Sequence, residues 1–120
     1  LTVKENVCLA SQIKGKKVDA KELNQVLKLL GLEHKKDRFA NELSGGQQQR
    51  VAMARAILAH TDIILADEPT GNLDGENAKN VMDILKALNK EGKTIVLVTH
   101  DLKIANYADR IIRLEQGKIV

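Results

Sequence analysis

The sequence predicts an α/β fold, with a helical first half followed by a parallel-sheet segment and a C-terminal hairpin. Helix-capping residues and apolar positions at helical spacing recur through the first half of the chain. Two short, wholly apolar runs, 63–66 and 94–98, lie on either side of another helical pattern. That is the arrangement of a right-handed βαβ unit, whose two strands are parallel. Extended stretches at 110–115 and 118–120 flank a Gln-Gly turn, which predicts the hairpin.

Two helices are expected in the N-terminal part of the chain. Thr2 and Glu5 have the spacing of a capping box, in which the side chain of each residue bonds the backbone N–H of the other. The helix that they open should end before Lys14. Asp19 caps a second helix, in which leucine and valine recur at helical spacing. Gly31 is expected to stop this helix, because glycine adopts the left-handed conformation common after a helix end.

A polar connector at 33–41 leads to a third helix. Ser44 caps this helix, Gln47 stands three residues further on, and the helix should continue to about Ala59. Its first two residues are glycines, which expose backbone N–H groups and allow a ligand to approach closely. The helix dipole favours an anion at the same place. A plain helix cap with flexible glycines is the alternative, and it is the better explanation of this motif taken alone.

The sheet segment begins with the apolar run 63–66, which is expected to be a strand buried on both faces, as parallel strands usually are. Asp74 caps a fourth helix, Gly92 ends it, and the second apolar run forms the next strand. We therefore divide the chain into a helical segment, 1–60, and a sheet segment, 61–120.

Polar residues follow both predicted strands. Asp67 and Glu68 come after the first, and Thr99, His100 and Asp101 come after the second. Ligands bind outside the carboxyl ends of the strands in an open α/β sheet. A carboxylate there is suited to hold Mg²⁺, usually through water, and a second carboxylate can orient or deprotonate an attacking water. The acidic pair alone is equally well explained as the cap of a turn, but His100 at the adjacent strand end favours a functional site.

The composition excludes several classes of function. The formal charge is only 19 − 16 = +3, and the aromatic residues are limited to Phe39 and Tyr107, so no platform exists for stacking bases and no nucleic-acid partner is expected. No apolar run approaches the ~18 residues of a membrane-spanning helix. The single Cys8 excludes an internal disulfide and is expected to be buried.

No Gly-x-x-x-x-Gly-Lys-Ser/Thr loop, the usual cradle for the β- and γ-phosphates, occurs.

Four motifs together resemble the nucleotide-binding domain of ABC (ATP-binding cassette) ATPases. Residues 43–47, Leu-Ser-Gly-Gly-Gln, resemble the signature motif of this family. Residues 63–68 resemble its Walker B strand with the catalytic glutamate, residues 71–74 its D-loop, and His100 its switch histidine. The motifs stand in the order and spacing of the family. The run 66–74 is similar to the branch that serves lipoprotein release, cell division, and macrolide or antimicrobial-peptide export.

The resemblance implies a partial P-loop NTPase fold of the ABC type, with ATP and Mg²⁺ as cofactors. It implies that Asp67 positions Mg²⁺, that Glu68 polarises the attacking water, and that His100 senses the γ-phosphate. The nucleotide-binding residues that it implies are Ser44, Gly45, Gly46, Gln47 and Asp74. In this family the signature residues act on ATP held by a partner domain, and the D-loop aspartate links the two domains.

In the family, a nucleotide-stacking aromatic residue, the Walker A loop and the Q-loop precede the segment that resembles residues 2–7. Gln12 follows that segment and is therefore not the Q-loop glutamine. We expect 1–60 to belong to the helical subdomain and 61–120 to be the C-terminal part of the catalytic core, together one incomplete domain that is inactive alone. The implied partners are a second nucleotide-binding domain, in a head-to-tail dimer, and an integral-membrane transporter subunit or domain. The implied location is peripheral, at the cytoplasmic face of the cell membrane.

Two rival functions are weighed against this one. The first is a non-catalytic fragment that only binds a partner, which the missing phosphate loop supports. The second is a DNA-maintenance ATPase, which shares the signature and Walker B elements but inserts long coiled coils or zinc modules before the signature. The segment before Leu43 is short and has neither heptads nor cysteine pairs, which disfavours this second rival. We also expect apolar strand edges to be exposed, and hence aggregation, oligomerisation or pairing with another copy.

Overall fold

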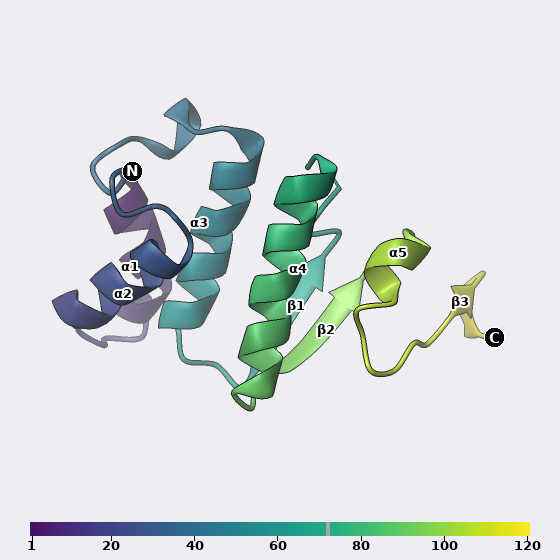
Figure 1. Ribbon diagram of the computed structural model, residues 1–120. Coiled ribbons are helices and arrows are strands. Elements are labelled where there is room, and N and C mark those ends of the chain that lie inside the picture. Colours follow the sequence, from purple (N-terminus) through teal and green to yellow (C-terminus); the bar gives the residue numbers. More distant parts are fainter. Residues whose placement is uncertain (72) are drawn as a thin grey trace.

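The computed structural model describes residues 1–71 and 73–120. The molecule is elongated, with principal extents of 45 × 29 × 25 Å. Three helices form one end, a fourth helix covers a small parallel sheet in the middle, and a short hairpin forms the other end (Figure 1). The N-terminus lies in the helical end and the C-terminus in the hairpin, as the α/β organisation predicted from sequence requires.

The three helices of the first half are α1 (Val3–Ile13), α2 (Ala20–Leu29) and α3 (Gly45–Leu58). Each begins after the capping residue predicted for it. Thr2 and Ser44 both form complete capping boxes, and the Asp19 side chain accepts a hydrogen bond from the backbone of Lys21. Gly31 has a φ of 69°, the left-handed conformation expected of a residue that stops a helix.

The polar connector between α2 and α3 is more ordered than its composition suggests. It contains a short 3₁₀ helix, η1 (Ala40–Glu42), and Phe39 forms an isolated antiparallel bridge with Thr2. The Val3 N–H donates to the Arg38 carbonyl at 2.8 Å. The connector is therefore held against the start of α1, because the unpaired N–H groups of that helix end provide donors for it.

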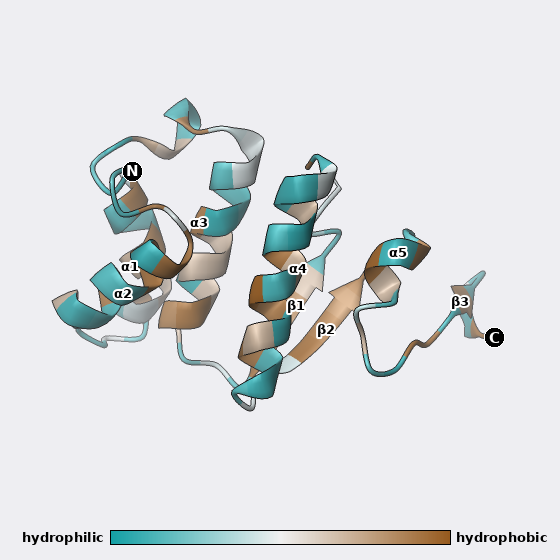
Figure 2. Ribbon diagram, viewed as in Figure 1, coloured by the Kyte–Doolittle hydropathy of each residue, from teal (hydrophilic) through white to brown (hydrophobic). Residues whose placement is uncertain are grey.

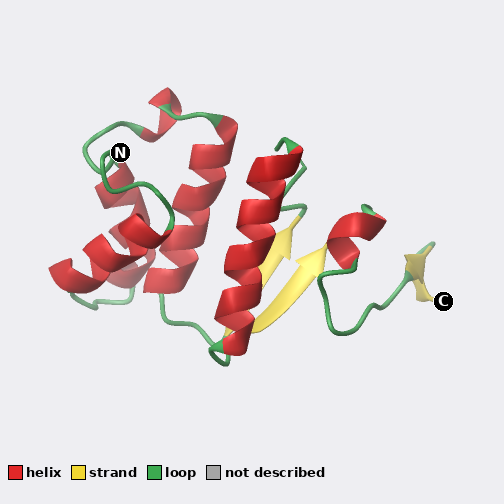
Figure 3. Cartoon of the chain, viewed as in Figure 1, coloured by secondary structure: helices red, strands yellow, loops and turns green. Residues whose placement is uncertain are grey.

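The sheet segment is a βαβ unit of β1 (Ile63–Asp67), α4 (Gly75–Lys90) and β2 (Thr94–Val98), as Figure 3 shows by secondary structure. The two strands are parallel over five residue pairs, from Ile63 opposite Thr94 to Asp67 opposite Val98. This confirms the predicted pairing. The first strand extends one residue beyond the predicted run and thereby includes Asp67.

One prediction about the sheet is wrong within the described residues. The strand at 63–66 is buried on one face only: Ile64 and Ala66 are buried, whereas Ile63 and Leu65 are exposed. The α4 helix covers the buried face, and the two strands are apolar over most of their length, apart from Asp67 and Thr94 (Figure 2). A wholly apolar strand therefore exposes alternate side chains here, because no second layer of the described chain covers them.

Two further elements follow β2. Helix α5 (Leu102–Ala105) is a single turn that begins after Asp101, and it was not predicted from sequence because four residues are too few for a periodic pattern. The predicted hairpin is present but shorter than the predicted stretches, as β3 (Leu114–Glu115) pairs with β4 (Lys118–Ile119).

A continuous hydrophobic core joins the helical end to the face of the sheet that α4 covers. Its most deeply buried large side chains are Val3, Val7, Leu27, Leu32 and Val81. Cys8 is also buried, as predicted, and this burial raises the pKa of its thiol. The core thus holds α3 and α4 together, and one group of candidate site residues lies where these two helices begin.

Candidate active site

Glu68 and His100 come together at the carboxyl ends of β1 and β2, where the sequence analysis placed them. The Glu68 Oε1 atom lies 2.6 Å from His100 Nδ1 and accepts a second hydrogen bond from the His100 backbone N–H at 3.0 Å. The Thr99 hydroxyl donates to Glu68 Oε2 at 3.3 Å. The Glu68 carboxylate is therefore held by two consecutive residues of the neighbouring strand end.

The backbone of Glu68 is bent to make this contact. Its N–H donates to the Val98 carbonyl at 2.8 Å and so continues the ladder between β1 and β2. Its φ is 46°, a left-handed conformation that costs energy in a residue with a Cβ. The carbonyl of Glu68 then accepts from the Gly71 N–H at 3.1 Å, which closes a turn with Pro69 in its second position. The turn directs the chain away while the side chain faces β2.

The electrostatics of this pair favour an ionised carboxylate. The hydrogen bond from the His100 side chain is the largest cause that lowers the pKa of Glu68 below its ordinary value. Desolvation opposes this effect, while the backbone N–H and charge of His100 and the Thr99 hydroxyl add to it. The His100 side chain is 90% exposed and that of Glu68 is 36% exposed, so an incoming ligand can reach the pair from solvent.

Asp67 ends β1 and is exposed beside Glu68, opposite Val98 of β2. In the part of the chain that the structure describes, no cluster of three or more His, Cys, Asp or Glu side chains could hold a metal ion. A protein cage for a metal is therefore not formed by these residues. A single exposed carboxylate does fit Mg²⁺, which is commonly held by one or two carboxylates together with substrate phosphates and water.

The predicted phosphate-recognition element is the first turn of α3. The Ser44 hydroxyl accepts from the Gln47 N–H at 3.2 Å, and Gln47 Oε1 accepts from the Ser44 N–H at 3.1 Å. A Cβ added at Gly45 would meet nothing within 4 Å, and one added at Gly46 would make only ordinary contact, 3.4 Å from Leu73 Cδ2. Neither glycine has a positive φ. The fold of this chain therefore does not require glycine at either position.

Asp74 caps α4, as predicted, and accepts from the backbone N–H of Asn77 at 2.9 Å. Gly71, Leu73 and Asp74 of the predicted D-loop are described, whereas Asn72 lies outside the described residues. The start of α4 packs beside the start of α3, since Gly46 neighbours Leu73 and Asn77. The structure thus forms two groups of site residues: one at the strand ends and one where the two helices begin.

Sequence reasoning missed the residues that join α3 to α4. Arg50 Nη1 donates to Asn77 Oδ1 at 3.4 Å, and this contact links positions 27 residues apart. Asn77 stands three residues after the cap Asp74, and Arg50 stands four residues after Gly46. Such spacing shows only that each pair shares a helix face. Nothing in the sequence indicates that the two faces meet.

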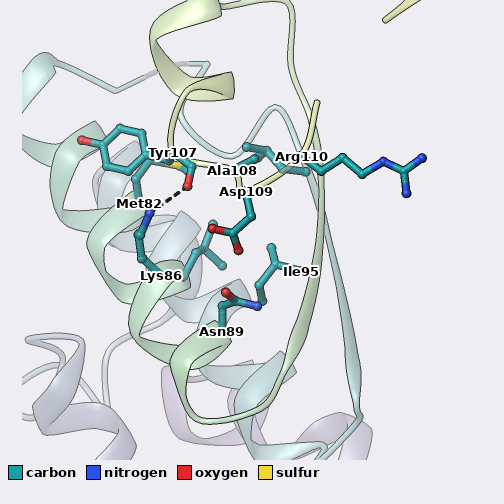
Figure 4. A pocket seen from close by; sticks show the side chains of 10 residues that line it. Met82, Lys86, Asn89, Ile95, Tyr107, Ala108, Asp109 and Arg110 are labelled. Atoms are coloured by element: carbon teal, nitrogen blue, oxygen red, sulfur yellow. Dashed lines mark hydrogen bonds between the residues drawn. The ribbon is translucent and has the colours of Figure 1, made fainter. Parts of the chain in front are cut away.

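A separate cavity lies beside α4, away from the candidate site residues (Figure 4). It has a volume of about 220 Å³ between α4, β2 and the segment that follows α5. Met82, Ile95 and Leu97 form apolar walls, and the Lys86 ammonium group donates to the Tyr107 carbonyl at 3.1 Å across its edge. None of the candidate site residues lines this cavity.

Comparisons with known proteins show the family to which the chain belongs. The family described as ABC transporter matches residues 1–71. The chain belongs to this family of ABC transporter ATP-binding proteins. Its fold matches a dimeric bacterial ABC transporter cassette, MJ0796, with a TM-score of 0.87 and 44% identity, over 99% of this chain and 54% of that one. A post-hydrolysis state of the same cassette, bound to ADP and Pi, matches with a TM-score of 0.83.

Curated relatives are similar over the whole chain. The macrolide export ATP-binding/permease protein MacB of Campylobacter jejuni (strain 81-176) is 51% identical over 100% of this chain and 19% of its own length. The cell division ATP-binding protein FtsE of Streptococcus pneumoniae (strain D39) is 43% identical over 99% of this chain and 53% of its own length. The chain thus spans about a fifth to a half of the length of these relatives. None of the helices described here has the length and apolar character needed to cross a membrane.

Proposed function

We propose that this chain acts as the C-terminal portion of an ABC transporter ATPase, which couples ATP binding and hydrolysis to transport across a membrane. The observation that carries the proposal is the contact between Glu68 and His100 at the ends of two parallel strands. This is the edge of an α/β sheet at which nucleotides bind, and the carboxylate there is kept ionised. An ionised, partly exposed carboxylate is the group that a general base for water requires.

The hydrogen bonds of Glu68 define how it would hold that water. An ionised carboxylate offers about four lone-pair sites, two on each oxygen. The backbone N–H and protonated Nδ1 of His100 occupy both sites on Oε1, and the Thr99 hydroxyl occupies one on Oε2. The remaining site, on Oε2, is the one that we assign to the attacking water. Its proton would pass to Oε2 while His100 keeps the carboxylate in place.

The same contact defines how His100 would meet a phosphate. Because the Glu68 carboxylate only accepts hydrogen bonds, the Nδ1 atom of His100 carries a proton. The Nε2 atom then donates to a phosphate oxygen only if the imidazole is positively charged. We propose that His100 recognises the γ-phosphate through Nε2, with the Glu68 carboxylate holding the ring in place through Nδ1.

Asp67 is the proposed Mg²⁺ ligand. When bound, Mg²⁺ neutralises charge on the phosphate groups and polarises them. Asp67 is exposed at the end of β1, next to Glu68 in sequence, so it would hold the ion near the proposed base. We further propose that Ser44, Gly45, Gly46 and Gln47 bind nucleotide phosphate through the start of α3. The support is that the fold does not require the two glycines, whereas close approach of a ligand would.

The proposed partners follow from the relatives. The MJ0796 cassette is dimeric, so we propose a head-to-tail pair with a second nucleotide-binding domain, in which the α3 start and Asp74 face the partner. MacB is an ATP-binding/permease protein, so we propose an integral-membrane subunit or domain as the second partner and a peripheral location at the cytoplasmic face of the membrane. The non-catalytic alternative, a fragment that only binds a partner, predicts no dependence on Mg-ATP.

The first experiment is Mg-ATP binding by the 120-residue chain, measured by calorimetry with Asp67→Asn and a matched control. Asp83→Asn makes the same chemical change at an exposed position of α4. Binding that Asp67→Asn abolishes and Asp83→Asn preserves would support a nucleotide site within this chain. Absence of binding would place the site mainly in sequence outside it.

Hydrolysis is tested in the full-length protein that carries these residues. Glu68→Gln removes the base but keeps an oxygen that can accept from His100, so it should stall phosphate release while ATP still binds. Glu76→Gln, an exposed glutamate in the first turn of α4, is the matched control. Undiminished turnover in Glu68→Gln would contradict the proposed mechanism.

A further inference from the structure

The contact between the first turns of α3 and α4 extends the proposed function, on which this inference rests. Gly46 and Arg50 lie on one face of α3, one turn apart, and both neighbour Asn77 of α4. A Cβ added at Gly46 would stand 3.8 Å from Asn77 Cγ, and Arg50 Nη1 donates to Asn77 Oδ1. The two helix starts are thus joined by both packing and a hydrogen bond.

Asn77 is held from its own helix as well. Its backbone N–H donates to Asp74 Oδ1 at 2.9 Å, and its side-chain amide donates to Asp74 Oδ2 at 3.3 Å. The amide group of Asn77 therefore faces Asp74, which leaves its Oδ1 oxygen facing Arg50. Arg50, Asn77 and Asp74 form one connected chain of polar contacts across the two helices.

The environment of Arg50 shows that its guanidinium group is confined. Its Nε atom is buried and has no hydrogen-bond partner among the described residues. A buried donor without a partner costs stability, which opposes the gain from the hydrogen bond between Nη1 and Asn77. An arginine is nevertheless expected at this position if its rigid guanidinium is needed to hold Asn77 at a defined position.

We propose that Arg50 is a positioning residue, which acts through Asn77 to hold the nucleotide-binding start of α3 at a fixed place relative to Asp74 and the turn that follows Glu68. Under the proposed head-to-tail pairing, the α3 start and Glu68 serve different nucleotides. The Arg50–Asn77 contact therefore couples the two ATP sites of the dimer. Arg50 itself does not touch the nucleotide.

A double-mutant cycle in the full-length protein tests this proposal, with Arg50→Ala, Asn77→Ala and the double variant. Each single variant should weaken the coupling between the two ATP sites by about fivefold or more, and so bring the Hill coefficient for ATP towards one. The kcat of each single variant should fall as well. The double variant should be no worse than the poorer single variant, because both changes remove one interaction. The intrinsic affinity of a single site for ATP, measured at low occupancy with Glu68→Gln in the background, should stay within about twofold in all three, because Arg50 does not contact the nucleotide.

Asn80→Ala is the matched control, since it makes the same change at an exposed position on α4, three residues from Asn77. Arg50→Lys should restore part of the lost kcat, because lysine can still donate to Asn77 Oδ1. Additive effects in the double variant, or an unchanged kcat and Hill coefficient in Asn77→Ala, would overturn the proposal. If Arg50→Ala fails to fold, Asn77→Ala and Arg50→Lys still decide it. If the Glu68→Gln variant hydrolyses ATP at the wild-type rate, that result would instead refute the proposed function.

Discussion

His100 Nδ1 lies 2.6 Å from Glu68 Oε1, although the two residues are 32 positions apart in the chain. The parallel pairing of β1 and β2 creates this proximity, because the strands end together at Asp67 and Val98. The backbone N–H of His100 reinforces it by donating to the same oxygen. The pair is thus a consequence of strand register. A substitution of either side chain should therefore change the ionisation or the hydrogen bonding of the other.

The first prediction concerns the ionisation of Glu68. Because His100 lowers the pKa of Glu68 in the folded chain, the stabilisation from this contact is present above the ordinary glutamate pKa of about 4.3 and is lost as the pH falls through the lowered value. In His100→Ala, the pKa of Glu68 should rise towards the ordinary value. Carbon-detected NMR titration of the glutamate carboxyls measures both. A Glu68 midpoint that His100→Ala leaves unchanged would show that the ring is not the main cause.

The second prediction separates stability from function at Gly45. Gly45→Ala should stabilise the fold by up to about 1 kcal/mol, because alanine is the better helix former and the new methyl group meets nothing within 4 Å beyond its chain neighbours and the backbone of its own helix. The same variant should lose nucleotide-dependent activity, because the methyl group blocks close approach to the N–H groups of α3. Thermal unfolding and phosphate release measure the two effects.

Gly75→Ala provides the control for this experiment. Gly75 is the first residue of α4, just as Gly45 is the first residue of α3, and its Cβ would also meet open space. It should gain similar stability and keep activity. Full activity in Gly45→Ala would contradict the assignment of the α3 start to nucleotide binding.

The third prediction concerns the buried polar link between α1 and α3. The Ser11 hydroxyl is buried and donates to the Leu58 carbonyl at 2.8 Å, which is one of the carbonyls left without a partner where α3 ends. Ser11→Ala should cost about 1–3 kcal/mol, because it leaves that carbonyl buried and unpaired. Urea unfolding measures this loss. A change below about 0.5 kcal/mol, the size typical of surface substitutions, would mean that water replaces the hydroxyl.

The fourth prediction concerns the uncovered face of the sheet. Leu65 is 77% exposed and Val96 is 45% exposed on neighbouring strands, so the isolated chain should self-associate through this face. The double substitution Leu65→Ser and Val96→Ser should raise the monomer fraction in analytical ultracentrifugation. Leu29→Ser on α2, which removes an exposed leucine far from the sheet, is the control. A wild-type chain that is monomeric at all concentrations would refute this prediction.

The sequence was sufficient to predict most of the helices and strands because their signals are local. Thr2, Asp19, Ser44 and Asp74 each mark a helix start by an interaction that spans no more than three residues. The apolar runs at 63–66 and 94–98 mark strands in the same way. The parallel pairing could also be predicted, because two strands joined through a helix are almost always parallel neighbours in one sheet.

The rest depends on contacts between distant residues. The sequence placed Glu68 and His100 at adjacent strand ends, but it did not indicate that they bond to each other. That contact accompanies a positive φ at Glu68, which no neighbouring residue predicts. The Arg50–Asn77 contact depends on how α3 and α4 lie side by side. The prediction that 63–66 is buried on both faces was wrong. The residue types show that a strand is apolar, but they do not show whether a second layer covers it.

The left-handed backbone at position 68 has an evolutionary consequence. Glycine or asparagine would occupy a φ of 46° at lower cost than glutamate does. If Glu68 is the base that we propose, selection for catalysis and selection for thermal stability favour different residues at this position. A duplicated copy of the gene that is no longer selected for hydrolysis should accumulate glycine or asparagine at position 68 early, before its hydrophobic core begins to change.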